Sequence, residues 1–271
     1  MAIRHLKILF SLTLIAFAAV ACSTSPTGRS QMIWKSDEEL AVEAAQQFAK
    51  MKASMPLLTD RATIDYIACV ANAIVDVLEP PYSDLDWEMA IFEVDAINAF
   101  AMPGGKIGIM TGILNAAQNQ HQLAAVIGHE IAHVTARHSN ERASRSTVSG
   151  VGIQVVAVLL GGGHQGATYT AYEALNAGAA LGIMLPFSRS QESEADIIGL
   201  DYMAKAGFDP RESVPLWQNM TAESEEDEPA EFLSTHPSSS KRIDALVSRF
   251  GSTLSLYNEA QKQGHNPNCS K

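Results

Sequence analysis

Apolar residues recur at helical spacing over most of the chain, and one short region has the pattern of strands instead. Ser36 followed by Glu39 is a capping box, which predicts a helix that runs to about Ala53. Thr59 and Asp60 predict the start of a second helix. Its apolar stripe consists of Ile64, Ile67, Ala71, Ile74 and Leu78.

The strand pattern lies between the second and third predicted helices. Residues 87–94, 98–102 and 106–110 have the composition of strands, and Pro103-Gly104-Gly105 predicts a hairpin turn between the last two. An open edge strand of such a hairpin can pair with an extended peptide backbone. The alternative interpretation is a purely structural hairpin.

A third helix begins after the capping residue Asn119. Its apolar stripe is Leu123, Ile127, Ile131 and Val134. His129 and His133 lie on a different face, so we expect one face to be buried and the two histidines to be presented from another.

Beyond this helix the pattern is less regular. Residues 139–187 are rich in Ser, Gly and Ala, and their apolar stretches are shorter than the roughly 20 residues that a membrane span needs, so we expect buried or site-covering helices. Ser188 or Ser190 predicts the start of a helix to about Ala206. Residues 222–231 predict an acidic loop, and residues 237–250 predict a last helix before a polar tail.

The amino-terminal residues have a targeting pattern. A basic start is followed by an apolar run over residues 8–19, and the segment ends Ala21-Cys22. This predicts a signal peptide over residues 1–21 that resembles a bacterial lipoprotein signal, with Cys22 as the acylated residue. A simple cleaved signal with an incidental cysteine is the alternative. Residues 22–35 are then expected to be a linker.

Composition restricts the class of protein. The chain has 271 residues, 46% of them hydrophobic and 18% charged, which is typical of a globular protein. The net charge of −11 argues against nucleic acid as a partner, because phosphate binding needs a basic surface. After export, Cys69 and Cys269 are expected to form a disulfide, although Cys69 suits a buried free thiol as well.

The third helix carries a pattern with a defined chemistry, His129-Glu130-Ile131-Ala132-His133. Histidines four residues apart lie one turn apart on a helix and can bind one zinc ion at about 2.0–2.1 Å. Glu130 can then act as general base toward a water molecule at the ion. Gly128 and Ala132, small residues that flank the histidine pair, are expected to leave room around such a site. The alternative is a helix with two surface histidines.

A third ligand must come from elsewhere, and one segment offers three carboxylates. Glu192 and Asp196 are four residues apart and share a helix face, where Gly199 permits close approach of another helix. Glu192 as ligand and Asp196 as the partner of a ligand histidine fit the usual arrangement around zinc. Glu194 lies about 200° around the helix from Glu192, so we expect it to be solvated.

Several segments together resemble the secreted, lipoprotein-type members of metallopeptidase family forty-eight, which also holds HtpX and the CAAX prenyl proteases. They are residues 98–105, the metal motif, residues 187–196, and residues 235–243 with Thr235-His236-Pro237. The resemblance implies a gluzincin-type α+β fold, mostly helical with a small sheet edge beside the metal helix, and one zinc ion bound by His129, His133 and Glu192. It implies a metallopeptidase domain over residues 36–254, with residues 255–271 as a polar tail.

The resemblance also implies a role in quality control of envelope proteins. The expected protein is a zinc endopeptidase at the periplasmic face of the bacterial outer membrane, held there by a lipid anchor and acting on misfolded envelope proteins. A soluble periplasmic location is the alternative. A chaperone-like assembly factor with little proteolysis is the competing function, while a structural lipoprotein leaves the metal motif unexplained.

His236 has three competing interpretations. It can stabilise the oxyanion of the tetrahedral intermediate, a role for which Arg242 is a second candidate. Its ring nitrogen can instead take the fourth ligand position of zinc at rest. The third interpretation is a helix-start histidine hydrogen-bonded to nearby backbone.

Overall fold

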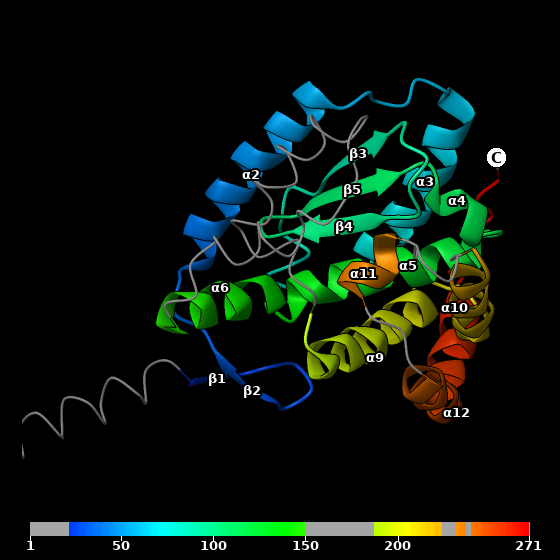
Figure 1. Cartoon of the computed structure of the whole chain (residues 1–271). Coiled ribbons are helices and arrows are strands. Elements are labelled where there is room, and N and C mark those ends of the chain that lie inside the picture. The colour runs from blue at the N-terminus through cyan, green and yellow to red at the C-terminus, as the bar shows by residue number, and fades with distance from the viewer. Residues whose placement is uncertain (1–21, 150–186, 224–230, 237–239, 271) are drawn as a thin grey trace, which may run out of the picture.

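The computed structural model describes residues 22–149, 187–223, 231–236 and 240–270. The predicted signal peptide, the apolar stretches within residues 150–186 and the centre of the acidic loop lie outside the described residues. Within them the chain is mostly helical with small sheets, which confirms the predicted α+β class (Figure 1).

The two predicted amino-terminal helices are present with their predicted caps. Helix α2 spans Asp37–Ser54, and the Ser36 side chain accepts a hydrogen bond from the Glu39 amide. Helix α3 spans Arg61–Val75, and the Asp60 carboxylate accepts one from the Thr63 amide. These caps satisfy amide groups that have no partner within the helix, which fixes where each helix begins.

A sheet of three strands lies between α2 on one face and α3 with the metal helix on the other. Its strands are β3 (Glu88–Phe92), β4 (Ala99–Met102) and β5 (Lys106–Met110). The order is β3-β5-β4, with β5 parallel to β3 and antiparallel to β4. Strand β4 is therefore an edge strand of this sheet.

Alternation of side chains gives the sheet two buried faces. Phe100 and Met102 of β4 pack with Phe48 of α2 on one face. Ala99 and Ala101 of the same strand join the core formed by α3 and the metal helix on the other face. Because side chains of a strand alternate between faces, four residues of β4 serve both cores.

The turn between β4 and β5 needs its glycines. Gly104 and Gly105 have φ angles of 77° and 76°, a region that other residues rarely adopt. A Cβ atom on Gly104 would also lie 2.8 Å from Cβ of Ala41, so the turn packs closely on α2.

Helix α5 (Gln120–Thr135) carries the metal motif and packs most extensively against α9 (Arg189–Lys205). The two helices meet at Gly128 and Gly199, where a Cβ on Gly199 would lie 2.7 Å from the His129 amide nitrogen. The expected close approach at Gly199 is present. Gly128, however, does not leave room for a substrate, because the backbone of α9 fills the space beside it.

The remaining elements surround this helix pair. They are α4 (Ile113–Ala116), α6 (His138–Ser149), the 3-10 helix η1 (Pro210–Glu212), α10 (Ser213–Ala222), α11 (Glu231–Thr235) and α12 (Ser240–Lys262). In the part of the chain that the structure describes, no helix has the length and apolar character needed to cross a bilayer.

The segment expected to be a linker instead contains a small hairpin. Strands β1 (Cys22–Thr24) and β2 (Ser30–Met32) pair antiparallel, and Figure 1 shows them below α6 and beside α9. Gln31 is buried and its side-chain amide donates a hydrogen bond to the Ala136 carbonyl at 2.6 Å. The hairpin was not predicted because contacts with α5 and α6, rather than its own polar sequence, hold it in place.

The carboxy-terminal region also differs from the prediction. Helix α12 continues to Lys262, twelve residues past the expected end at Phe250. In the structure a disulfide joins Cys69 of α3 to Cys269 across a sequence separation of 200 residues. The Cys269 amide also donates to the Gln120 side chain at 2.8 Å, so this bond and the expected bridge hold the polar tail against α3 and α5.

We expect the double variant Cys69→Ser/Cys269→Ser to lose about 2–5 kcal/mol of unfolding free energy, because the bridge restricts a very long loop in the unfolded chain. Urea denaturation of the variant and of oxidised and reduced wild type measures this. Reduced wild type should match the variant. Equal midpoints for all three, or two free thiols in peptide mapping of exported protein, would contradict the bridge.

Candidate metal centre

Four buried side chains from three parts of the chain converge beneath the sheet. His129 and His133 come from α5, Glu192 from the first turn of α9, and His236 follows α11. One potential ligand atom from each lies within 4.8 Å of the others. The structure thus brings together the two predicted histidine ligands, the predicted carboxylate ligand and His236.

The spacing of these atoms suits one tetrahedral ion. Nε2 of His129 lies 3.0 Å from Nε2 of His133, and each lies 3.5 Å from an oxygen of Glu192. Nδ1 of His236 lies 3.2 Å from Nε2 of His129 and 3.1 Å from Oε1 of Glu192. Donor atoms around tetrahedral zinc are about 3.3–3.4 Å apart, given bonds of about 2.0–2.1 Å.

The polar groups that face the outer ring nitrogens of the two α5 histidines support the same conclusion. Nδ1 of His129 lies 3.1 Å from Oδ1 of Asp196, and Nδ1 of His133 lies 2.9 Å from Nδ1 of His138. A proton on each Nδ1 leaves a lone pair on each Nε2. Two lone pairs then face each other across 3.0 Å, which is the arrangement of two ligand atoms of one metal ion. Two imidazoles and a carboxylate are typical zinc ligands.

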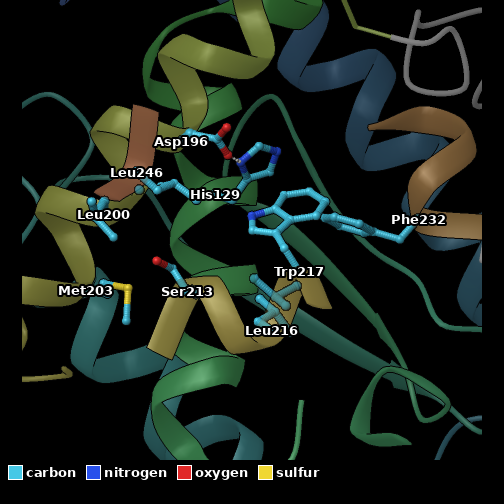
Figure 2. A pocket seen from close by; sticks show the side chains of 12 residues that line it. His129, Asp196, Leu200, Met203, Ser213, Leu216, Trp217, Phe232 and Leu246 are labelled. Atoms are coloured by element: carbon cyan, nitrogen blue, oxygen red, sulfur yellow. Dashed lines mark ion pairs between the residues drawn. The ribbon is translucent and has the colours of Figure 1, made fainter. Parts of the chain in front are cut away.

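Asp196 lies behind His129, where a partner of a ligand histidine was expected, and Arg242, a sequence candidate for the oxyanion role, lies behind Asp196. Arg242 bonds both oxygens of Asp196 at 2.7 Å and approaches Oε2 of Glu192 at 2.8 Å. Its guanidinium also lies over the Trp217 ring, 4.1 Å from the centroid. Figure 2 shows Asp196 directed at His129, with Trp217 on the other side of that ring. The structure therefore uses Arg242 to hold two carboxylates.

Electrostatics make the cluster attractive to a cation. Burial lowers the pKa of His129, but the carboxylates of Asp196 and Glu192 outweigh it and raise the pKa to about 9. Burial raises the pKa of Glu192, but His236 and His129 outweigh it and hold the pKa far below its usual range. Burial and the neighbouring His129 hold the pKa of His133 well below its usual value, so that ring is neutral.

Glu130 lies beside the donor cluster without being part of it. Its carboxyl is buried, and burial raises its pKa above the usual range. His236, His129 and, more weakly, the backbone amide of Ala101 on the edge strand β4 oppose this rise in the pKa. A carboxylate with a raised pKa next to a metal cluster suits a general base.

His236 touches both parts of the site. Besides the contacts of Nδ1 with the donor cluster, its Nε2 lies 3.3 Å from Oε1 of Glu130. The ring stacks on Phe232 with centroids 4.4 Å apart. Its backbone amide bonds the Phe232 carbonyl at 2.8 Å, but the side chain is directed into the site and not to nearby backbone.

Sequence reasoning missed several residues around His133. Glu194 is not solvated: it is 3% exposed and contacts His138, Thr27 and Arg29. Phe187 stacks on the His133 ring with centroids 3.6 Å apart. Buried Arg142 lies over Phe187 in turn. Burial lowers its pKa to about 9, although Glu192 and Glu130 oppose this. The only local indication was the position of His138 five residues after His133.

These features define a metallopeptidase-type centre, in which a helix supplies two histidines and an adjacent acid and a second helix supplies a carboxylate. The chain belongs to peptidase family M48, whose model matches residues 62–250. This confirms the resemblance found in the sequence, the gluzincin-type fold and zinc as the metal that the donor set fits.

Curated relatives come from organelles and bacteria. The mitochondrial metalloendopeptidase OMA1 of Schizosaccharomyces pombe is 36% identical over 76% of this chain and 59% of its own length. The beta-barrel assembly-enhancing protease of Yersinia pestis is 31% identical over 74% of this chain and 41% of its own. The OMA1 metalloendopeptidase of Bos taurus is 32% identical over 88% of this chain and 47% of its own length. The chain thus spans about half the length of these relatives.

Proposed function

We propose that this chain is a zinc-dependent endopeptidase that hydrolyses unfolded or misassembled proteins of the bacterial envelope. The observation that carries the proposal is the convergence of His129, His133 and Glu192 directly beside the buried acid Glu130. Among the residues that the structure describes, these supply each group that metal-assisted hydrolysis needs.

The protein's own residues divide the chemistry between them. His129, His133 and Glu192 would hold zinc, which when bound acts as a Lewis acid on a peptide carbonyl. Glu130 takes a proton from the attacking water and delivers it to the leaving amine. Asp196 and Arg242 fix the orientation of His129 and Glu192, so the donors are in place before substrate arrives.

The position of the edge strand β4 favours an unfolded protein as the substrate. The strand packs against α5, and its Ala101 amide lowers the pKa of the Glu130 carboxyl, so the strand runs beside the helix of the proposed base. An extended chain that pairs with this edge would bring its backbone to the metal site. Pairing through main-chain groups does not depend on side chains, which suits hydrolysis of many misfolded proteins.

Two observations support an envelope location with an acylated Cys22. Export is implied by the amino-terminal pattern, and the Cys69–Cys269 disulfide suits an oxidising compartment. The name of the Yersinia pestis relative refers to the assembly of β-barrel proteins. We extend that class of partner, unfolded barrel proteins, to this chain as part of the proposal. Peptides of this class form extended strands that an edge can accept.

An assembly factor with little proteolysis is the second candidate. It is favoured by the position of His236, whose side chain contacts both the donor cluster and the proposed base and so restricts the site at rest. In this function the same edge strand would hold an unfolded protein without cutting it.

We expect the purified mature chain to cleave a urea-unfolded β-barrel protein and to leave the folded form intact. Removal of the metal with a chelator should stop cleavage, and one equivalent of zinc should restore it, because the donor set fits one ion. Gel analysis with elemental analysis measures both. Cleavage that persists after full zinc removal would contradict the metallopeptidase proposal.

We expect Cys22→Ser to move the protein from the membrane fraction to the soluble periplasmic fraction, because the variant has no thiol to acylate. Immunoblots of fractionated cells measure the shift. Cys69→Ser is the matched control and should remain with the membrane. If Cys22→Ser also stays in the membrane, the anchor is not at this residue.

A further inference from the structure

The two α5 histidines differ in what holds their outer ring nitrogens. Nδ1 of His129 faces the carboxylate of Asp196, which Arg242 fixes by two hydrogen bonds of 2.7 Å. Nδ1 of His133 faces no carboxylate. It lies 2.9 Å from Nδ1 of His138, the first residue of α6, whose side chain is fully buried.

The zinc-ligand role of His133 determines which ring nitrogens of His133 and His138 carry protons. Nε2 of His133 points into the donor cluster, so its lone pair is the ligand and its proton is on Nδ1. Nδ1 of His138 must therefore accept that proton's hydrogen bond. The proton of His138 is then on Nε2, which lies 3.2 Å from Oε2 of Glu194 and donates to it.

Glu194 is fixed in turn by the amino-terminal hairpin. The Thr27 hydroxyl donates to Oε1 at 2.7 Å, and Nε of Arg29 donates to Oε2 at 2.9 Å. The terminal nitrogens of Arg29 bond both oxygens of buried Glu141 at 2.8 and 2.7 Å. One guanidinium thus joins the hairpin to α9 and α6.

The hairpin holds Arg29 in position. The Ser25 amide bonds the Arg29 carbonyl at 2.8 Å, and the Arg29 amide bonds the Ser25 hydroxyl at 3.0 Å. Gly28 permits this tight turn with a φ angle of 89°. The Arg29 side chain is therefore oriented by its own loop before it meets Glu194.

We propose that His138, Glu194 and Arg29 are positioning residues for the metal ligand His133, and that the β1–β2 hairpin is therefore a working part of the metal site. The proposal rests on the zinc site of the proposed function. His138 and Glu194 fix the tautomer and the ring orientation of His133, as Asp196 does for His129. Arg29 holds Glu194 in position, as Arg242 holds Asp196. The two supports are built alike, with one additional imidazole in the second.

The test is the zinc affinity of the full chain, measured by competition with a chromophoric chelator. His138→Phe keeps the ring and removes both hydrogen bonds, and Arg29→Ala releases Glu194. We expect each to weaken zinc binding by about 10–100-fold. His138→Gln, which restores one acceptor and one donor, should recover most of the affinity. The visible spectrum of the Co²⁺-substituted protein should change in His138→Phe and return toward wild type in His138→Gln.

Arg145→Ala is the matched control. Arg145 contacts the same Glu141 at 2.6 Å but is exposed and does not touch Glu194. Its loss should leave zinc affinity within about twofold of wild type. An equal loss of zinc affinity in Arg145→Ala and Arg29→Ala would overturn the proposal, because the removal of one positive charge beside Glu141 would then explain both.

Further outcomes keep the proposal falsifiable. Wild-type affinity and an unchanged Co²⁺ spectrum in His138→Phe would overturn it. If His138→Phe does not fold, the zinc affinities and Co²⁺ spectra of His138→Gln and Arg29→Ala are compared instead. Wild-type zinc affinity in Arg29→Ala refutes the role of the hairpin. Because zinc binding is measured without substrate, absence of peptidase activity in wild type would refute the proposed function and leave this result intact.

Discussion

Glu130→Gln is expected to reduce peptide-bond cleavage by roughly 100- to 10,000-fold while one zinc ion stays bound. The amide has the shape of the acid but cannot accept a proton from water. Glu130 is absent from the four-residue donor cluster, so the ligands remain intact. Its raised pKa, caused by burial, places its proton affinity closer to that needed at neutral pH.

The measurement pairs cleavage of an unfolded β-barrel protein with the zinc content of the same sample. Glu93→Gln is the control, since it makes the same change at an exposed position. Retained cleavage in Glu130→Gln would remove Glu130 from the mechanism. If Glu130→Gln loses cleavage but restores every envelope defect of a deletion strain, the assembly-factor function is favoured over proteolysis.

His236→Ala is expected to raise the basal rate of proteolysis. The geometry favours the interpretation in which His236 restrains the resting site, because Nδ1 lies among the donors and Nε2 lies 3.3 Å from the proposed base. If the open form is about 1–10% populated, removal of the ring raises the rate about 10- to 100-fold. His129, His133 and Glu192 remain, and three protein ligands are typical of catalytic zinc.

The opposite sign would establish the competing role. A fall in turnover with normal zinc content would mean that His236 stabilises the oxyanion, which is the other predicted role. His265→Ala, an exposed histidine in the tail, is the control and should leave the rate unchanged. Unchanged turnover in His236→Ala would show that the residue serves the fold alone.

The sequence alone determined the features that depend on local spacing. Residues four apart on a helix share a face, so the donor pair His129 and His133 and the relation of Glu192 to Asp196 could be predicted without coordinates. The caps at Ser36 and Asp60 and the glycine turn before β5 are local in the same sense. These features set the metal motif, and local capping residues likewise set the starts of α2, α3, α5 and α9.

Tertiary structure decided which faces of the helices α5 and α9 are buried by other parts of the chain. Helical position correctly places Glu194 away from Glu192, yet that second face is buried because His138 and the hairpin residue Arg29 pack on it. No periodicity within α9 contains this information. The same holds for Gly128, whose open side is filled by the backbone of α9.

The direction of the chain after the metal helix is a further tertiary effect. Arg137 separates α5 from α6 with a φ angle of 57°, a conformation that non-glycine residues seldom adopt. Its ion pair with Asp37 of α2, at 2.8 Å, helps to hold that turn. The turn brings His138 back against His133, so the second support of the metal site depends on contacts with distant elements, whereas the ligand pair itself follows from helical spacing.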